Sequence, residues 1–336
     1  MQLIRRRAYA RAGLVGNPSD GYHGKTISII VRNLWAEVTL YEWDQVEIIW
    51  SEQDQSRFRS VHDLVTDVKL HGYYGGIRLV KATIKQFVEY CKRKGHRLHG
   101  RNFSVRYHSG IPRQVGLAGS SAIIVATLRC LMDFYGVDIP RRVQPSLALA
   151  VETQELGIAA GLQDRVVQVY EGAVYMDFSR QQMEEIDGFR CGQYEPLDPA
   201  LLPPLYVAYS TESSEPTEVL HGDLRARFER GDEDVLQAMV RLGDLASQAR
   251  AAILARQSQR LGQLINANFD VRRSICRLPE WQVAMVDRAR QAGATASFAG
   301  SGGAIVGTYP DEPTFDRLQK ALSEIGCRVL RPQITG

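Results

Sequence analysis

Small residues in the middle of the chain could let the backbone approach an anion. Residues 112–122 read Pro-Arg-Gln-Val-Gly-Leu-Ala-Gly-Ser-Ser-Ala. An alternating segment at 103–107 before them predicts a strand, and the apolar run 123–134 after them predicts a buried helix. Glycines at 116 and 119 allow close backbone approach, and a helix N-terminus offers free N–H groups. The pattern predicts a phosphate-binding loop; the alternative is an ordinary capped helix after a turn.

Hydroxyl and carboxyl groups could supply the metal and proton chemistry that such a loop needs. Ser120 and Ser121 can cap the helix or hold a metal ion beside a phosphate. Glu152 lies late in a helix expected over 144–156, and Asp164 follows in a small-residue loop. Each carboxylate alone is more often a solvated residue. No Gly-Lys-Ser/Thr ends the loop, so it is not a Walker loop.

Composition excludes several other functions. A chain of 336 residues suggests two domains or one large one, and a net charge of +3 is too small to argue for nucleic acid. No stretch is long and apolar enough to span a membrane, and the N-terminus lacks the core of a signal peptide. Five scattered cysteines without metal-ligand spacing fit a reducing cytoplasm. We expect a cytoplasmic protein, monomer or homodimer, that binds small molecules rather than nucleic acid or membrane.

Patterns of apolar and turn residues predict the elements that would position these groups. Expected strands cover 7–12, 26–31, 35–40, 46–50, 102–108, 172–178, 205–209 and 327–330. Expected helices cover 77–94, 144–156, 234–256, 261–268, 279–292 and 312–325. Residues 51–74 and 211–219 read as polar connections, 179–187 as a polar turn or hairpin, and 296–306 as strand, glycine turn and strand. We expect a first domain over 1–190 and a second over 191–336.

Three motifs, in this order, resemble those of the GHMP kinase superfamily (galactokinase, homoserine kinase, mevalonate kinase and phosphomevalonate kinase). Residues 112–122 resemble the second motif, Pro-x-x-x-Gly-Leu-Gly-Ser-Ser-Ala, with Ala118 in place of the usual glycine. The galactokinase first motif, Arg-x-x-Leu-x-Gly-Glu-His-x-Asp, is matched at four positions, while Asn17 and Pro18 replace its Glu-His. The matched residues are Arg11, Leu14, Gly16 and Asp20. Residues 296–306 resemble a shortened third motif, Thr-Gly-Ala-Gly-x-Gly-Gly.

This resemblance implies an α+β fold of two domains, the first like domain 2 of ribosomal protein S5 and the second ferredoxin-like. It implies that Asp164 contacts the reacting hydroxyl beside Arg11, that Asp20 binds sugar hydroxyls, and that Ser121 and Glu152 hold Mg²⁺. The implied ATP-binding residues are Pro112, Gly116, Leu117, Ala118, Gly119, Ser120, Ser121 and Ala122. The third-motif residues that would lie against this loop and the substrate are Gly300, Ser301, Gly302 and Gly303.

Within the superfamily, three stretches resemble the glucuronokinases, which are known best from plants. They are Gly-Asn-Pro-Ser-Asp at 16–20, Asn-Phe-Asp-Val-Arg-Arg at 268–273 and Gly-Ser-Gly-Gly-Ala at 300–304. The resemblance implies ATP-dependent phosphorylation of the anomeric hydroxyl of D-glucuronate. A buried substrate carboxylate needs a cationic partner; the candidates are Lys25, Arg272 and Arg273, with Arg272 favoured. Two alternatives remain open: a kinase for another sugar such as galacturonate or galactose, and a ligand-binding protein of this fold without catalysis.

Overall fold

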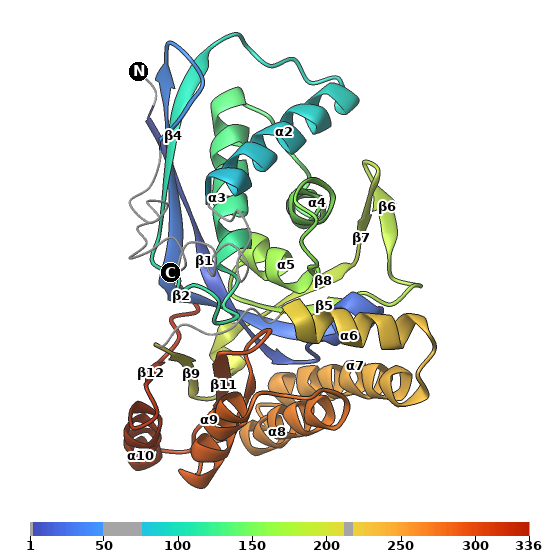
Figure 1. The fold of residues 1–336 in the computed structure, drawn as a ribbon, viewed down its shortest axis with the longest axis vertical. Helices are drawn as coiled ribbons and strands as arrows, with labels where there is room; N and C mark the ends of the chain where they lie inside the picture. Colours follow the sequence, from blue (N-terminus) through green and yellow to red (C-terminus); the bar gives the residue numbers. More distant parts are fainter. Residues whose placement is uncertain (1–2, 50–75, 212–217, 336) are drawn as a thin grey trace, which may run out of the picture.

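The computed structural model describes residues 3–49, 76–211 and 218–335 (Figure 1). The connection expected over 51–74 and most of the polar segment 211–219 therefore lie outside the described residues. Among the described residues, two large sheets are each covered by helices, and a third sheet is a two-stranded hairpin (Figure 1). In this layered arrangement, the apolar faces of the sheets and the helices are buried against each other.

The first sheet is built around one long strand. Strand β2 (Lys25–Trp43) is continuous, so the separate strands predicted at 26–31 and 35–40 are wrong. It pairs along its length with β1 (Leu3–Val15), and a register shift after Tyr9 separates two stretches of pairing. The other strands follow the order β3-β4-β2-β5-β8. Their bounds are β3 Glu47–Ile49, β4 Asn102–Ser109, β5 Ala173–Asp177 and β8 Gln193–Leu197.

Strand β8 pairs with β5, so the first sheet extends past the expected domain boundary at residue 190. The segment 179–187, expected as a polar turn or hairpin, contains β6 (Glu184–Ile186), which pairs with β7 (Phe189–Cys191) just beyond it.

Helices cover one face of this sheet (Figure 1). Helix α3 (Gly119–Tyr135) packs on β1 and β2, and α2 (Gly76–Lys94) packs on α3. Because α3 is apolar on nearly every side, it is buried rather than amphipathic. Helices α4 (Gln144–Ala150) and α5 (Gln163–Tyr170) complete the layer. The predicted α2 and β4 are confirmed within one residue at each end.

The second sheet is antiparallel and has the order β10-β11-β9-β12. Its strands are β9 Leu205–Ser210, β10 Ser297–Phe298, β11 Ala304–Thr308 and β12 Cys327–Leu330. The helices of this half are α6 Glu218–Glu229, α7 Glu233–Leu254, α8 Ser258–Ile275, α9 Glu280–Gln291 and α10 Glu312–Ser323. Asp232 caps α7 by accepting the Val235 N–H, which explains where that helix begins. Helix α8 was predicted to end at 268, but it continues through the Asn-Phe-Asp-Val-Arg-Arg motif.

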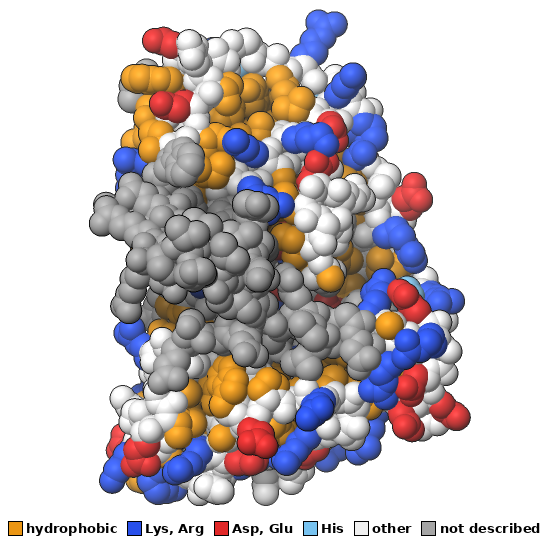
Figure 2. Space-filling model, in the orientation of Figure 1, with side chains coloured by type: hydrophobic (Ala, Val, Ile, Leu, Met, Phe, Trp, Pro, Cys, Tyr) orange, Lys and Arg blue, Asp and Glu red, His pale blue; other side chains and the backbone are white. Residues whose placement is uncertain are grey.

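The visible surface carries charges of both signs, as the small net charge of the sequence suggests. On the face in Figure 2, the coloured Lys, Arg, Asp and Glu side chains are interspersed along the right and lower edges. Within the described ranges no helix has both the length and the apolar character needed to cross a bilayer.

Candidate active site

Residues 112–122, the phosphate loop, connect β4 to α3. The left-handed backbone occurs at Gln114, Gly116 and Ala118, with φ values of +59°, +70° and +62°. Helix α3 begins directly at Gly119, where an added Cβ would make only ordinary contact with Ile111 at 3.5 Å. Gly116, rather than Gly119, is therefore the glycine whose backbone conformation the loop requires.

The two serines of the loop lie in the first turn of α3, and neither caps it. The Ser120 hydroxyl donates to Oε1 of Glu152 at 2.8 Å. The hydroxyl of Ser121, which is fully buried, donates back to the Ala118 carbonyl at 3.2 Å. The capping role considered for these serines is wrong, because both hydroxyls bond other groups.

The third-motif loop, residues 299–303, packs directly on the phosphate loop. A Cβ added at Gly300 would lie 2.1 Å from the Gly116 carbonyl oxygen. In the other direction, a Cβ at Gly116 would lie 2.7 Å from the Gly302 carbonyl oxygen. Gly303 similarly lies against Val115, where an added Cβ would be 3.0 Å from the Val115 Cα. The two loops can approach this closely only because glycines occupy the contact.

Arg11 of β1 connects the three motifs. Its Nε donates to Oδ1 of Asp164 at 2.6 Å. Its Nη1 donates to the carbonyls of Gly116 at 2.6 Å and Ala299 at 2.8 Å. The Arg11 side chain is 5% exposed and that of Asp164 17%, so solvent screens this ion pair weakly.

Two carboxylates approach each other beside Arg11. Asp164 lies in the first turn of α5, and Oδ2 of Asp20 accepts the N–H of Gln163 at 3.3 Å. Burial, together with the negative charge of Asp164, raises the pKa of Asp20 to about 6. The pair thus contains one carboxylate held by Arg11 and one that titrates close to neutral pH.

Glu152 reaches the site through an irregular helical turn. Helix α4 widens after Ala150 into a π-helical turn, Val151–Glu155, and the Glu152 side chain is 1% exposed. Such turns occur frequently at functional sites. Oε2 of Glu152 forms an ion pair with Nη2 of the buried Arg165. Arg165 Nη1 also donates to the Gly161 carbonyl at 2.7 Å and lies 3.4 Å from Asp164 Oδ2.

Sequence reasoning missed Arg165, since nothing in its spacing distinguishes it from a solvated helix residue. The carboxylate and hydroxyl oxygens of Glu152, Ser120 and Ser121 are hard ligands, and their chemistry fits Mg²⁺. Among the described residues, no group of three or more His, Cys, Asp or Glu side chains could hold a metal alone.

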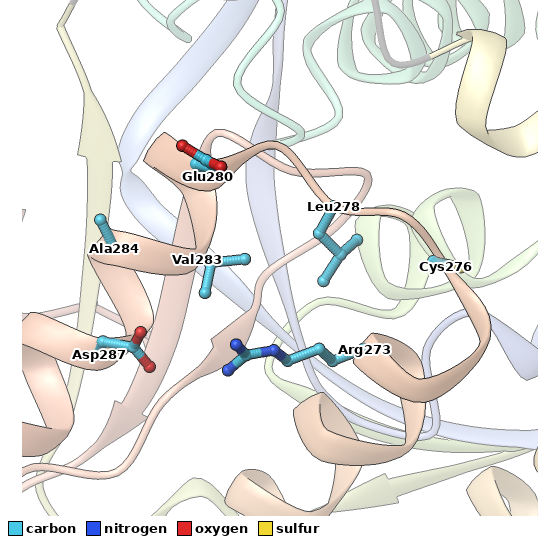
Figure 3. Close-up of a pocket in the computed structure, with 7 residues that line it drawn as sticks. All are labelled: Arg273, Cys276, Leu278, Glu280, Val283, Ala284 and Asp287. Carbon is cyan, nitrogen blue, oxygen red and sulfur yellow. The ribbon is translucent and has the colours of Figure 1, made fainter.

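The candidate carboxylate partners lie in three different environments. Arg272 of α8 is buried, and its Nη1 donates to Oδ1 of Asn17 at 3.1 Å. Lys25 instead pairs with Asp177 on the neighbouring strand at 3.7 Å. Arg273 is exposed and lines a hollow of about 360 Å³ between α8 and α9 (Figure 3). That hollow contains no residue of the three motifs.

Comparisons with known proteins identify the family of the chain. The family model described as "GHMP kinases N terminal domain" matches residues 78–172, and "GHMP kinases C terminal" matches 249–326. The chain belongs to the GHMP kinases, as the three motifs predicted, and this membership implies ATP as the phosphoryl donor.

Within that family, Glucuronokinase 1 of Arabidopsis thaliana is 43% identical over 332 residues, covering 97% of this chain and 89% of that protein. Probable glucuronokinase 2 of Arabidopsis thaliana is 44% identical over 334 residues, covering 97% and 88%.

Solved structures confirm the two-domain fold. Lactococcus lactis galactokinase complexed with galactose superposes with a TM-score of 0.78 at 17% identity, covering 99% of this chain and 94% of that one. Methanococcus jannaschii mevalonate kinase superposes with a TM-score of 0.71 at 17% identity, covering 100% and 99%.

Proposed function

We propose that this protein is a sugar 1-kinase that converts ATP and D-glucuronate to ADP and glucuronate 1-phosphate. Similarity to two glucuronokinases over 97% of the chain supports the substrate. The observation that carries the proposal is the Arg11 network, in which one buried side chain contacts Asp164, the phosphate loop and the third-motif loop. Phosphoryl transfer depends mainly on positioning and charge neutralisation, and this network supplies both.

The nucleotide half of the site is the phosphate loop. Backbone N–H groups of residues 116–121 at the start of α3 bind the ATP phosphates, and the positive end of the helix dipole favours them. Pro112, Leu117 and Ala122 complete the loop that shapes this cradle. Ser121 and Glu152 would hold Mg²⁺, with the Ser120 hydroxyl fixing one Glu152 oxygen. The bound ion would supply positive charge that offsets the charge of the phosphates.

The acceptor half contains the two aspartates. Asp164 accepts the hydrogen bond, and then the proton, of the sugar's anomeric hydroxyl as its oxygen attacks the γ-phosphate. The guanidinium of Arg11 forms an ion pair with Asp164 and offsets charge on the transferring group. Asp20 accepts hydrogen bonds from sugar hydroxyls. Gly300, Ser301, Gly302 and Gly303 close the site against the phosphate loop.

An ADP-release assay with five acceptors tests the proposal: glucuronate, galacturonate, galactose, mevalonate and homoserine. We expect turnover with glucuronate above all others and a product phosphorylated at the anomeric oxygen. Preference for another sugar would support the first alternative, an anomeric kinase of different specificity. Absence of turnover with every acceptor, in a protein that still binds ATP, would favour a ligand-binding role. None of the five cysteines forms a disulfide bond, which fits the cytoplasmic location that we propose.

A further inference from the structure

Arg272 is a buried cation that receives no counter-charge from the described part of the chain. The residue is 4% exposed. It donates to three oxygens, those of the Asn17 amide at 3.1 Å, the Gly300 carbonyl at 2.6 Å and the Ser301 carbonyl at 3.1 Å. All three acceptors are neutral, and the buried Nε–H has no hydrogen-bond partner. No Asp or Glu among the described residues pairs with it.

Comparison with Arg11 shows why this is unusual. Both arginines are buried, and both donate to the third-motif loop. Asp164 neutralises Arg11, whereas burial lowers the pKa of Arg272, and the charge of Arg11 acts in the same direction. The guanidinium of Arg272 lies over the Phe298 ring, 5.1 Å from its centroid, but this contact supplies no anion. A buried charge without an anionic partner is costly. The missing negative charge is therefore expected to come from a ligand.

Helix α8 carries Arg272 and also holds Asn17 in place. Asn268 lies one turn before Arg272 on the same face of the helix. Its Oδ1 accepts the Gly16 N–H at 2.7 Å, and its Nδ2 donates to the Asn17 carbonyl at 3.3 Å. The backbone of Asn17 is thus held against α8, three residues before the sugar-binding candidate Asp20.

The residue type at position 17 decides whether the charge of Arg272 is neutralised within the protein. The galactokinase motif has glutamate there, and a glutamate beside Arg272 would form an ion pair and cancel its charge. Asparagine keeps the hydrogen bond and leaves the site positive. Because the Asn17 oxygen accepts from Arg272, its Nδ2–H groups remain as donors.

We propose that Arg272 and Asn17 form the subsite for the carboxylate of the sugar acid, and that they set the preference for uronates over neutral hexoses. A guanidinium binds carboxylates through parallel N–H groups, and the Asn17 amide adds a neutral donor. The inference rests on the proposed kinase function and deepens it, because it assigns the residues that recognise the acid group.

The experiment compares D-glucuronate with D-glucose, which differ at C6. The variants are Arg272→Lys, Arg272→Gln and Asn17→Asp, and the exposed neighbour Arg273→Gln is the matched control. For each protein we would measure KM and kcat with both sugars, KM for ATP, and the melting temperature. Calorimetry with glucuronate and a non-hydrolysable ATP analogue measures binding directly.

We expect Arg272→Gln to raise the glucuronate KM by roughly 30-fold to several thousand-fold, the range for truncating one partner of a buried charge pair. The ATP KM of this variant should change far less than its glucuronate KM, and all parameters of the Arg273→Gln control should stay near wild type. Asn17→Asp is the sharpest test, because it supplies a counter-charge within the protein. It should raise the melting temperature while weakening glucuronate binding through like-charge repulsion.

Unchanged glucuronate KM in the Arg272 variants would overturn the subsite. Equal losses of affinity for ATP and for the sugar would also overturn it. The same holds for an Asn17→Asp variant that is more stable but binds glucuronate as wild type does. Either result would mean that Arg272 only stabilises the third-motif loop. If Arg272→Gln does not fold, Arg272→Lys and Asn17→Asp decide the question. If the wild type does not phosphorylate glucuronate at all, the proposed function fails, and glucuronate calorimetry on the same variants still tests the subsite.

Discussion

Gly161 and Asp20 are in direct contact, although they lie far apart in the sequence. A Cβ at position 161 would lie 2.1 Å from Oδ2 of Asp20 and 3.0 Å from its carboxyl carbon. The glycine therefore determines where the Asp20 carboxylate lies, beside Asp164 and below the start of α5.

Gly161→Ala should displace Asp20 and weaken sugar binding. Since one hydrogen-bonding carboxylate is moved, we expect the KM for the sugar to rise about tenfold or more, with the ATP KM nearly unchanged. Steady-state kinetics against both substrates measures this. Gly100→Ala, where an added Cβ meets nothing within 4 Å, is the control. A normal sugar KM in Gly161→Ala would show that Asp20 does not bind the sugar.

Asp164→Asn should retain nucleotide binding and lose roughly 10²–10⁴-fold in kcat if the carboxylate acts as general base. Asp133→Asn is a matched control, because it removes a surface ion pair with Arg6 instead of the buried pair with Arg11. Single-turnover assays would separate chemistry from product release. A loss below about tenfold would leave Asp164 only a positioning role.

Asp20 should make stability depend on pH. Its pKa is raised from 3.8 to about 6, so its contribution to stability is fully present below pH 4 and is lost as the pH rises through 6. Asp20→Asn removes this titration and should be more stable than wild type at pH 8, by up to about 3 kcal/mol, but not at pH 4. Urea unfolding of both proteins at the two pH values measures the difference. An equal difference at both would contradict the assigned shift.

Ala118→Gly should stabilise the protein. Ala118 has a φ of +62°, a conformation that disfavours residues with a Cβ by about 1–2 kcal/mol. Glycine also has greater freedom in the unfolded chain, so we expect a net gain of about 1 kcal/mol or less. Thermal and denaturant unfolding would detect it. A destabilised Ala118→Gly protein would mean that the Ala118 methyl group makes packing contacts that outweigh the backbone strain.

Glu152→Gln and Ser121→Ala should each raise the Mg²⁺ concentration needed for half-maximal rate, since each weakens or removes an oxygen ligand. Ser120→Ala separates the two serines, because Ser120 is the one bonded to Glu152. Ser146→Ala, whose hydroxyl donates to the Arg190 carbonyl, is the control. Binding of Mn²⁺ in the presence of ADP gives a readout independent of turnover. If Ser120→Ala alone changes metal affinity, Ser121 is not a ligand, and Ser120 acts on the metal directly or through Glu152.

Much of the fold could be predicted from local patterns. The helical spacing of apolar residues and Gly95 fixed α2, and the alternation before the phosphate loop fixed β4. The strand β2 was divided in the prediction because polar Arg32 and Asn33 interrupt its apolar pattern. Strand β2 stays continuous because it pairs with β1 on both sides of a register shift. The local sequence of β2 does not indicate that β1 is its partner.

The candidate site was predictable as motifs but not as contacts. Ordered glycine motifs identified the loops, yet nothing in the sequence indicated that Arg165 would pair with Glu152 in the interior. The π-helical turn that positions Glu152 depends on packing rather than propensity. The sequence made Lys25 a candidate partner for the substrate carboxylate, but in the structure Lys25 pairs with Asp177 of the neighbouring strand. Each of these outcomes depends on residues that meet only after the chain has folded.

Arg11 also imposes an order of events on synthesis of the protein. Arg11 is synthesised 288 residues before its acceptor Ala299. At a synthesis rate of about 5–20 residues per second, Ala299 is added roughly 15–60 seconds after Arg11. During that interval the first sheet can form, but the pocket around Asp164 lacks one wall. A chain interrupted before the third motif would thus present an incomplete site rather than a slower enzyme.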